Sequence, residues 1–353
     1  MAPAASRARL LDLVGSFAGR RIVVVGDYVL DRFVFGHPKR VSREAPVLVL
    51  RFWKEEELPG GAGNTTANIR SLGGVPLPVG VLGRDGAGEA LRRIFAERGI
   101  STEGLLEAPG YPTPTKTRIL GGGPHAIQQQ IVRYDREGRL PEDGALWSTL
   151  ARLLSEQARG VAGAVLSDYG YGAVSPAAVA PLKAALSPGA PVLVDSRHDL
   201  LSYSGVDAIT PNEEELEECA GFPIGDSEEA LARAARGVAD RIGCRAVLVT
   251  RGSRGMALFD GAAAPRWIPV HGTDQVADVT RAGDTVLATF SLALASGASP
   301  AEAALLANFA GGVVVMKTGT AVVTPEELKD AIAADRTILD RKTEDGRRKT
   351  VDE

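Results

Sequence analysis

The segment 278–285 combines small residues with carboxylates just before the long apolar stretch 286–295. The apolar stretch predicts a helix, so Asp284 falls in its first turn, directly after Ala282 and Gly283. The first N–H groups of a helix lack intrahelical partners, and with the helix dipole they form an anion site. A carboxylate beside that site can take a proton from a hydroxyl while the N–H groups hold a phosphoryl group. By spacing alone, an acidic helix start without chemistry explains these residues equally well.

A second set of candidate residues lies in the first quarter of the chain. Asp31 follows the first predicted strand by six residues, at the carboxyl edge where parallel sheets bind ligands. A carboxylate there can accept two hydroxyl hydrogen bonds, as sugar binding requires. Gly60 and Gly61 allow the backbone to approach a ligand closely, and Asn64 offers a donor and an acceptor at the next helix start. A turn aspartate and a tight glycine turn are the alternatives.

Charge and composition limit the class of protein. Forty Lys and Arg residues stand against 44 Asp and Glu, so the net charge is near neutral. A nucleic-acid-binding protein carries a basic surplus, which argues against that class, whereas a small phosphorylated ligand needs only two or three local cations. Cys219 and Cys244 have no metal or redox spacing, and the histidines are scattered singly, so a zinc site is not expected.

The chain has no apolar run that approaches the length of a membrane span. Near its start, Asp12 interrupts the apolar residues, so 1–19 predicts a short amphipathic helix rather than a signal peptide. We therefore expect a cytoplasmic protein without nucleic-acid or membrane partners.

Apolar runs rich in β-branched residues alternate with stretches of helical period along most of the chain. The runs are continuous, as in strands covered on both faces. The predicted strands are 22–25, 78–82, 164–166, 191–194, 208–210 and 246–249. The predicted helices are 62–72, 87–98, the region after Pro176, 213–220 and 227–241. This alternation predicts an α/β fold with a mainly parallel sheet and helices on both sides.

Two stretches, about 33–53 and 111–134, break this rhythm with short β-rich segments bounded by Pro and Gly. They predict antiparallel strands in a small separate sheet, which we interpret as a lid over one edge of the main sheet. Lys116, Arg118 and Arg133 lie on this lid. They could contact a phosphate on a ligand, arginine through its bidentate fork, or be solvated surface charges.

The chain ends in a segment of different character. Thr324 and Pro325, followed by two glutamates, predict a last helix start. From 335 to 353 the charges alternate without apolar period, which predicts a solvated tail.

The order of these motifs resembles that of the ribokinase-like, or PfkB, carbohydrate kinases, over about residues 21–328. The resemblance rests on Gly26-Asp27, Pro59 to Asn64, Gly83-Arg84-Asp85 and Gly283-Asp284-Thr285. Within that family the chain is most similar to kinase domains that act on D-glycero-D-manno-heptose 7-phosphate. Segments 40–46, 166–169, 210–212, 248–251 and 307–308 carry this closer likeness. The adenylyltransferase domain often fused to such kinases has no counterpart in the sequence, as in standalone kinases.

The resemblance implies a ribokinase-like three-layer sandwich with a small β lid, forming one kinase domain over residues 1–334. It implies transfer of the ATP γ-phosphoryl group to the anomeric hydroxyl of the heptose phosphate. Asp284 would be the base, and the N–H groups of Arg281, Ala282 and Gly283 would stabilise the charge. The sugar would be bound by Asp31, Gly60, Gly61 and Asn64, and its phosphate by Lys116, Arg118 and Arg133.

On the nucleotide side, the resemblance implies that Asn212 and Glu215 orient magnesium, Glu215 through water. Thr250, Gly252, Ser253 and Gly255 would form the loop under the ATP phosphates, and Asn308 would flank the adenine. An acidic helix start and a hairpin turn are the respective alternatives. The family also suggests a monovalent cation such as potassium near Asp278 and Thr280, and a homodimer through the lid.

Three positions differ from the most similar kinases. Arg281 replaces a glycine, Tyr171 replaces a lysine, and Ser196-Arg197 replaces Pro-Lys with the charge kept. Arg281 could add a cation beside the phosphoryl group or strain a turn that prefers glycine. Two rival functions therefore stay open: a kinase for another sugar or sugar phosphate, and a sugar-phosphate sensor without turnover.

Overall fold

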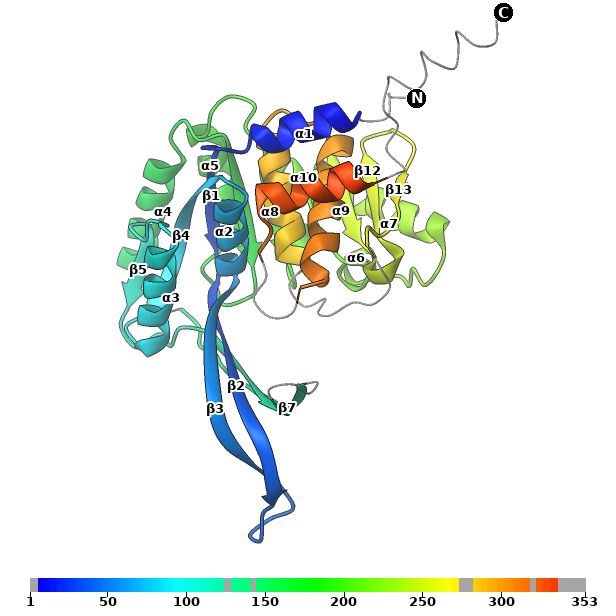
Figure 1. Ribbon diagram of the computed structural model, residues 1–353. Helices are drawn as coiled ribbons and strands as arrows, with labels where there is room; N and C mark the ends of the chain where they lie inside the picture. The colour runs from blue at the N-terminus through cyan, green and yellow to red at the C-terminus, as the bar shows by residue number, and fades with distance from the viewer. Residues whose placement is uncertain (1–5, 124–127, 141–143, 273–281, 318–321, 336–353) are drawn as a thin grey trace, which may run out of the picture.

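The computed structural model of the protein describes residues 6–123, 128–140, 144–272, 282–317 and 322–335. In these residues a large sheet is covered by helices on both faces, and a second sheet projects from the body (Figure 1).

The main sheet has the strand order β13-β12-β11-β10-β9-β8-β1-β4-β5. Its strands are β1 (Arg21–Gly26), β4 (Val75–Gly83), β5 (Leu105–Ala108), β8 (Gly163–Asp168), β9 (Val192–Ser196), β10 (Ala208–Ile209), β11 (Ala246–Thr250), β12 (Met256–Asp260) and β13 (Arg266–Ile268). The pairings from β11 to β5 are parallel, whereas β12 and β13 add antiparallel pairings at one end. The prediction of a mainly parallel sheet is confirmed.

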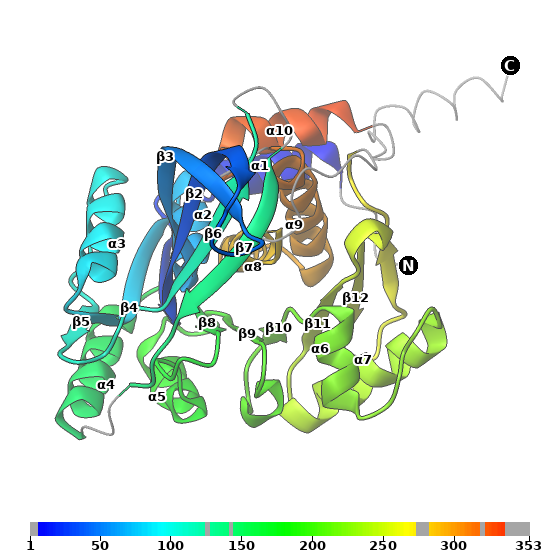
Figure 2. The same ribbon diagram turned by 90° about the horizontal axis from the view of Figure 1, so that it is seen from below.

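The helices divide between two apolar cores, one on each face of the sheet. They are α1 (Arg7–Gly15), α2 (Ala62–Ser71), α3 (Gly86–Glu97), α4 (Gly144–Ala158), α5 (Val179–Ala185), α6 (Glu213–Ala220), α7 (Glu228–Ile242), α8 (Ala282–Ala295), α9 (Pro300–Val315) and α10 (Pro325–Ala334). One core contains α1, α2, α3, α8, α9 and α10, and the other contains α4 to α7. Figure 2 shows the sheet between α8 on one side and α6 on the other. This is the predicted three-layer sandwich.

Every strand and helix predicted in the main layers is present. The sequence did not indicate β5, β12, β13, α4 or α9. The strands β5 and β13 are only four and three residues long, too short to show a pattern. The predicted helix at the start of the chain is α1, and the expected start at Thr324 is a capping box for α10. Residues 336–353 of the predicted tail lie outside the described residues.

The lid is a four-stranded sheet of order β3-β2-β6-β7, with β2 (Tyr28–Val41), β3 (Leu48–Gly61), β6 (Thr115–Gly121) and β7 (Gln129–Arg136). Two of its pairings are antiparallel as predicted, but β2 and β6 run parallel, from Leu30 beside Thr115 to Gly36 beside Gly121. The reason is that both strands leave the body in the same direction. The lid also begins earlier than predicted, so Asp31 and Gly60 are at its base.

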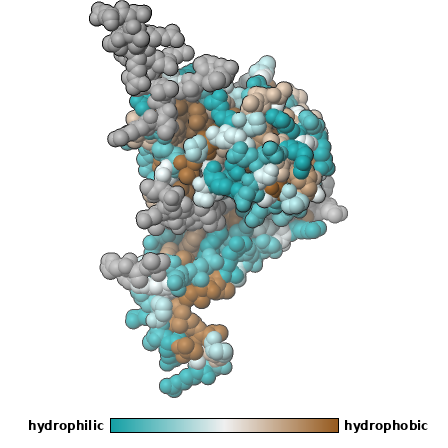
Figure 3. Space-filling view, turned by 90° about the vertical axis from the view of Figure 1, so that its right-hand side faces the viewer, coloured by the Kyte–Doolittle hydropathy of each residue, from teal (hydrophilic) through white to brown (hydrophobic). Residues whose placement is uncertain are grey.

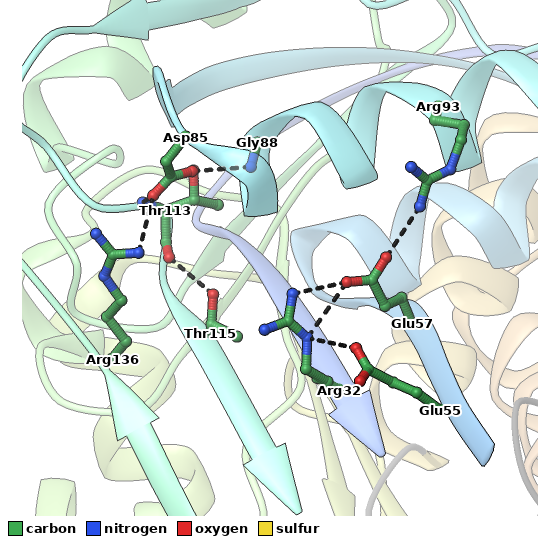
Figure 4. A network of polar contacts seen from close by, with 9 residues as sticks. All are labelled: Arg32, Glu55, Glu57, Asp85, Gly88, Arg93, Thr113, Thr115 and Arg136. Carbon is green, nitrogen blue, oxygen red and sulfur yellow. Dashed lines mark hydrogen bonds and ion pairs between the residues drawn. The ribbon is translucent and has the colours of Figure 1, made fainter. Parts of the chain in front are cut away.

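Polar contacts tie the back of the lid to α3 (Figure 4). Glu57 of β3 accepts hydrogen bonds from Arg32 at 2.7 Å and from Arg93 of α3 at 2.9 Å. Asp85 caps α3 and also lies 3.6 Å from Arg136 of β7. The base of the lid therefore has a defined position relative to the main sheet.

No helix among the described residues is both long and apolar enough to cross a membrane.

Candidate active site

A cleft of about 700 Å³ opens where β9, β10 and β11 end. This volume is in the range of small-molecule sites. Its lining includes ten of the predicted site residues: Asn212, Glu215, Thr250, Gly252, Ser253, Gly255, Ala282, Gly283, Asp284 and Asn308. The fold thus brings together the predicted nucleotide residues and the predicted base. Arg281, Asp278 and Thr280 lie outside the described residues.

Asp284 lies in the first turn of α8, where only 6% of its surface is exposed. Asn64, in the first turn of α2, donates from Nδ2 to Asp284 Oδ2 at 2.8 Å. The hydroxyl of Tyr169 donates to Asp284 Oδ1 at 2.8 Å, with Thr65 Oγ1 at 3.4 Å from the same oxygen. The carboxylate is therefore oriented by donors from two other elements of the fold, as a proton acceptor requires.

The side chain of Asn64 has hydrogen-bond partners within the protein. Its amide nitrogen is engaged by Asp284, and its amide oxygen accepts from Asn68 Nδ2 at 3.2 Å. Both ends of this side chain thus have protein partners. Asn64 therefore positions Asp284, and its role as a sugar ligand stays a prediction.

The sequence pointed to Tyr169 only as part of the segment 166–169 and did not predict its contact with Asp284. Its position depends on Asp27 at the end of β1. The Asp27 carboxylate accepts the backbone N–H groups of Tyr169, Tyr171 and Ala173 at 2.9, 3.0 and 2.9 Å. Burial raises the pKa of Asp27, while these three hydrogen bonds act in the opposite direction. The only signal in the sequence was an aspartate and a tyrosine directly after two strands.

On the predicted sugar side, Asp31 is paired with Arg118 of β6 at 2.6 Å, and both side chains are nearly buried. A Cβ atom at Gly60 would lie 2.5 Å from Asp31 Oδ2, so only glycine leaves room for this carboxylate. Gly61 has a φ of +56°, a left-handed conformation that favours glycine. Asp31, Gly60 and Arg118 thus form one compact group.

The three lid cations are not equivalent. Arg118 is paired with Asp31, and Arg133 is paired with Asp135 on its own strand. Lys116 instead lies over aromatic rings, 5.6 Å from the Tyr169 centroid and 5.9 Å from the Tyr171 centroid. Burial lowers the pKa of Lys116, and the cations Arg197 and Arg133 lower it further. Of these three cations, Lys116 is the one for which the described residues offer no carboxylate at ion-pair distance.

Asn212 and Glu215 form a capping box at the start of α6. Asn212 Oδ1 accepts from the N–H of Glu215 at 2.8 Å, and Glu215 Oε2 accepts from the N–H of Asn212 at 2.9 Å. The acidic helix start that the sequence offered as the alternative is therefore present. Both residues also line the cleft. Burial raises the pKa of Glu215.

Asp195, at the end of β9, joins Glu215 on the wall of the cleft. Burial raises the pKa of Asp195 to about 8, and the negative charges of Glu215 and Asp284 contribute to the rise. In the described part of the chain no three acidic, histidine or cysteine side chains form a metal-binding group by themselves. Mg²⁺ is usually bound by one or two carboxylates together with waters and phosphates, so Asp195 and Glu215 fit this ion.

The loop after β11 is a tight hairpin turn to β12, as the structural alternative predicted, and its residues also line the cleft. Gly252 and Gly255 both have positive φ angles, and a Cβ atom at Gly255 would lie 2.1 Å from the Ile268 carbonyl oxygen. Arg251 anchors the loop through Glu213 at 2.9 Å. Asn308 of α9 is also on the lining, where its Nδ2 donates to the carbonyl of Pro269 at 3.0 Å.

Comparison with known proteins agrees with these features. The pfkB family of carbohydrate kinases matches residues 20–327. The "Bifunctional protein HldE" of Mesorhizobium japonicum is 44% identical over 321 residues, and that of Pelobacter propionicus is 40% identical over 313 residues. These alignments cover 90% and 88% of this chain, but the chain spans only 63% of each relative.

Solved structures share the fold at low sequence identity. Arabidopsis thaliana ribokinase, complexed with ribose and ATP, gives a TM-score of 0.69 at 20% identity, with 90% of this chain and 100% of that chain covered. Escherichia coli phosphofructokinase-2, in complex with substrates and products, gives 0.70 at 20% identity, with 90% and 99% covered.

The raised pKa of Asp195 predicts a pH-dependent cost of folding. Below pH 4 the carboxyl is protonated in both states, and between pH 4 and about 8 only the unfolded chain loses the proton. The contribution of Asp195 to stability therefore falls over this range and is constant above it. Asp195→Asn keeps an acceptor for Thr210 Oγ1, now 3.2 Å from Asp195 Oδ1. Urea unfolding should show the variant gaining stability over wild type from pH 5 to 8, and a pH-independent difference would contradict this.

Proposed function

Because the chain belongs to the pfkB family of carbohydrate kinases, we propose that it phosphorylates D-glycero-D-manno-heptose 7-phosphate at its anomeric hydroxyl. ATP is the donor, and the products are the 1,7-bisphosphate and ADP. Identities of 40 to 44% with proteins named HldE, and the motifs at 40–46 and 166–169, support this acceptor. The observation that carries the proposal is the position of Asp284, which lies on the cleft and contacts Asn64 and Tyr169 on its other side.

In the proposed reaction Asp284 accepts the proton of the anomeric hydroxyl. The hydroxyl oxygen forms a bond to the γ-phosphorus, and the bond between that phosphorus and the β–γ bridging oxygen breaks to release ADP. The N–H groups at the start of α8, including those of Ala282 and Gly283, stabilise the transferring charge. Asn64 and the Tyr169 hydroxyl keep the Asp284 carboxylate oriented.

The nucleotide is assigned to the 700 Å³ cleft, with the loop of Thr250, Gly252, Ser253 and Gly255 under its phosphates. Asp195 and Glu215 would hold the magnesium ion, Glu215 through water, and Asn308 would flank the adenine. Magnesium supplies charge neutralisation on the phosphates when bound. A monovalent cation near Asp278 and Thr280 is part of the proposal, since a related phosphofructokinase was solved in complex with potassium.

The sugar is assigned to the group around Asp31, Gly60 and Gly61, and its phosphate to the lid cations. Of these cations, Lys116 is the best placed to bind the phosphate, because Asp31 and Asp135 already neutralise the charges of Arg118 and Arg133. A kinase for another sugar phosphate is the rival, favoured by one observation. Tyr171 stands where similar kinases have a lysine, so this side of the site has one cation fewer. The Tyr171 hydroxyl instead donates a hydrogen bond to Glu137 at 2.7 Å. A panel of sugars and sugar phosphates with ATP separates the two.

We further assign residues 1–334 to a single kinase domain acting in the cytoplasm. Its first and last helices support the assignment: α1 packs against α10, and Arg7 donates to the carbonyl of Asp335 at 2.7 Å.

The proposed partner of the protein is a second copy, bound through the lid. Brown, hydrophobic residues gather on the projecting lid in Figure 3. Large apolar side chains that are more than one third exposed there are Val41, Val47, Leu48, Phe52, Trp53, Ile131, Val132 and Tyr134. Such patches are rare on monomers, and a second lid offers a matching apolar face.

For the base, we expect Asp284→Asn to lower kcat by about 10² or more, the usual contribution of general-base catalysis. ATP affinity should change little because the carboxylate meets the acceptor hydroxyl. The control is Glu326→Gln, an exposed acid in the first turn of α10. Steady-state kinetics and calorimetry provide the test, and a near-normal kcat for Asp284→Asn would refute the assignment.

For the acceptor phosphate, Lys116→Met should cost about 1.5–3 kcal/mol, the range for a charge-assisted hydrogen bond. The effect should appear as a KM for the sugar phosphate raised about 10- to 150-fold, with kcat nearly unchanged. Lys183→Met, at an exposed ion pair with Asp207, is the control. Equal use of the unphosphorylated sugar by wild type would show that the lid cations do not select a phosphate.

For the dimer, Phe52→Lys should shift the protein from dimer to monomer in analytical ultracentrifugation, because the 62% exposed ring lies in the apolar lid patch. Met316→Lys, 45% exposed outside the lid, should leave the mass unchanged. A wild-type protein that sediments as a monomer at all concentrations would exclude the lid dimer.

A further inference from the structure

Arg197 occupies the junction of the nucleotide cleft and the sugar side. It follows β9 and belongs to the lining of the cleft, and its guanidinium carbon lies 4.5 Å from the ring centroid of Tyr169. Lys116 lies over the same ring, 5.6 Å from its centroid. Among the described residues no carboxylate forms an ion pair with either cation. Two cations are therefore kept near one aromatic ring, and both would attract an anion bound between them.

The ring that carries Arg197 has a defined place in the site. The backbone N–H of Tyr169 donates a hydrogen bond to Asp27, and the Tyr169 hydroxyl donates one to Asp284. One end of the side chain is thus at the proposed base while its face supports the guanidinium. Stacking uses the flat face of the guanidinium and leaves its N–H groups in the plane able to donate to a phosphate.

The charges around Arg197 agree with this placement. Burial lowers the pKa of Arg197, but Tyr169, Asp284, Asp195 and Glu215 outweigh that effect and raise it overall. The guanidinium is therefore a permanent cation beside the carboxylates proposed for proton transfer and for magnesium.

We propose that Arg197 donates to the γ-phosphoryl group of ATP as it is transferred, and that Tyr169 positions both Arg197 and Asp284 around that group. Phosphoryl transfer spreads negative charge over three equatorial oxygens, and a planar, bidentate cation is suited to stabilise it. The inference rests on the proposed function, because it assumes that ATP binds in the cleft and that Asp284 is the base.

The first test is nucleotide binding, which needs no sugar. Calorimetry should show that Arg197→Met weakens ATP about 10-fold or more while ADP changes less than about 2-fold, because only ATP has the γ-phosphate. Arg197→Lys should recover part of the ATP affinity. Arg233→Met is the matched control, since Arg233 also stacks at 4.5 Å, on Phe222, and neither residue lines the cleft. Equal losses for ATP and ADP, or none, would overturn the assignment.

The second test is turnover with whichever sugar phosphate the wild type accepts. Arg197→Met should lower kcat about 10²- to 10³-fold, the usual effect of removing a donor that stabilises transition-state charge. If the accepted sugar is not the heptose phosphate, the proposed acceptor fails while this comparison still decides the role of Arg197. An unchanged kcat in Arg197→Met would overturn it.

The positioning role of Tyr169 has its own readout. Tyr169→Phe keeps the ring under Arg197 but removes the hydroxyl that stabilises the Asp284 carboxylate, so the pKa of the base should rise. The acidic limb of the kcat profile should then move to higher pH, while the ratio of ATP to ADP affinity stays as in wild type. An unmoved acidic limb would exclude Tyr169 as the positioning residue.

Discussion

The hydrogen bond between Asn64 and Asp284 is the contact on which the site depends, because it joins the two halves of the chain. Asn64 is in the first turn of α2 and Asp284 in the first turn of α8, and the two helices pack side by side on one face of the sheet. Two helix N-termini consequently converge beside one buried carboxylate. The dipoles of both helices favour the ionised form of this carboxylate, as the proposed role of Asp284 as a base requires.

A second buried carboxylate, that of Asp27, positions the loop after β8 at the site. Asp27 has three backbone N–H partners in the loop after β8, and that loop carries Tyr169 to Asp284 and Tyr171 toward the lid. Burying an acid is unfavourable unless its oxygens are satisfied, and here the partners are all main-chain groups of the loop. The cost of burying Asp27 is thereby coupled to the geometry of the loop after β8.

The charges of the site are balanced only in part by one another. Asp195 and Glu215 lie together on the nucleotide side, whereas Arg197 and Lys116 lie together at the junction with the lid. The acidic pair offers a site for a cation and the basic pair a site for an anion, while Asp195 and Glu215 also interact favourably with Arg197. Charges that are already in place before the ligands bind favour phosphoryl transfer, and they lower the stability of the folded protein.

Local signals in the sequence determined the elements and the kind of site. Continuous apolar runs predicted the parallel strands, and Asn212 with Glu215 announced the start of α6, because capping and periodicity involve residues a few positions apart. The motifs around Asp284 and the glycines at 60 and 61 indicated a kinase only through their resemblance to a known family.

Only the tertiary structure decided which groups meet. The pairing of Asp31 with Arg118, the parallel register of β2 and β6, and the hydrogen bonds from Asn64 and Tyr169 to Asp284 join residues 85 to 220 positions apart. No pattern within a helix or a strand encodes such contacts. They follow from the way two apolar cores pack on the sheet, and that packing brings Asn64 to Asp284.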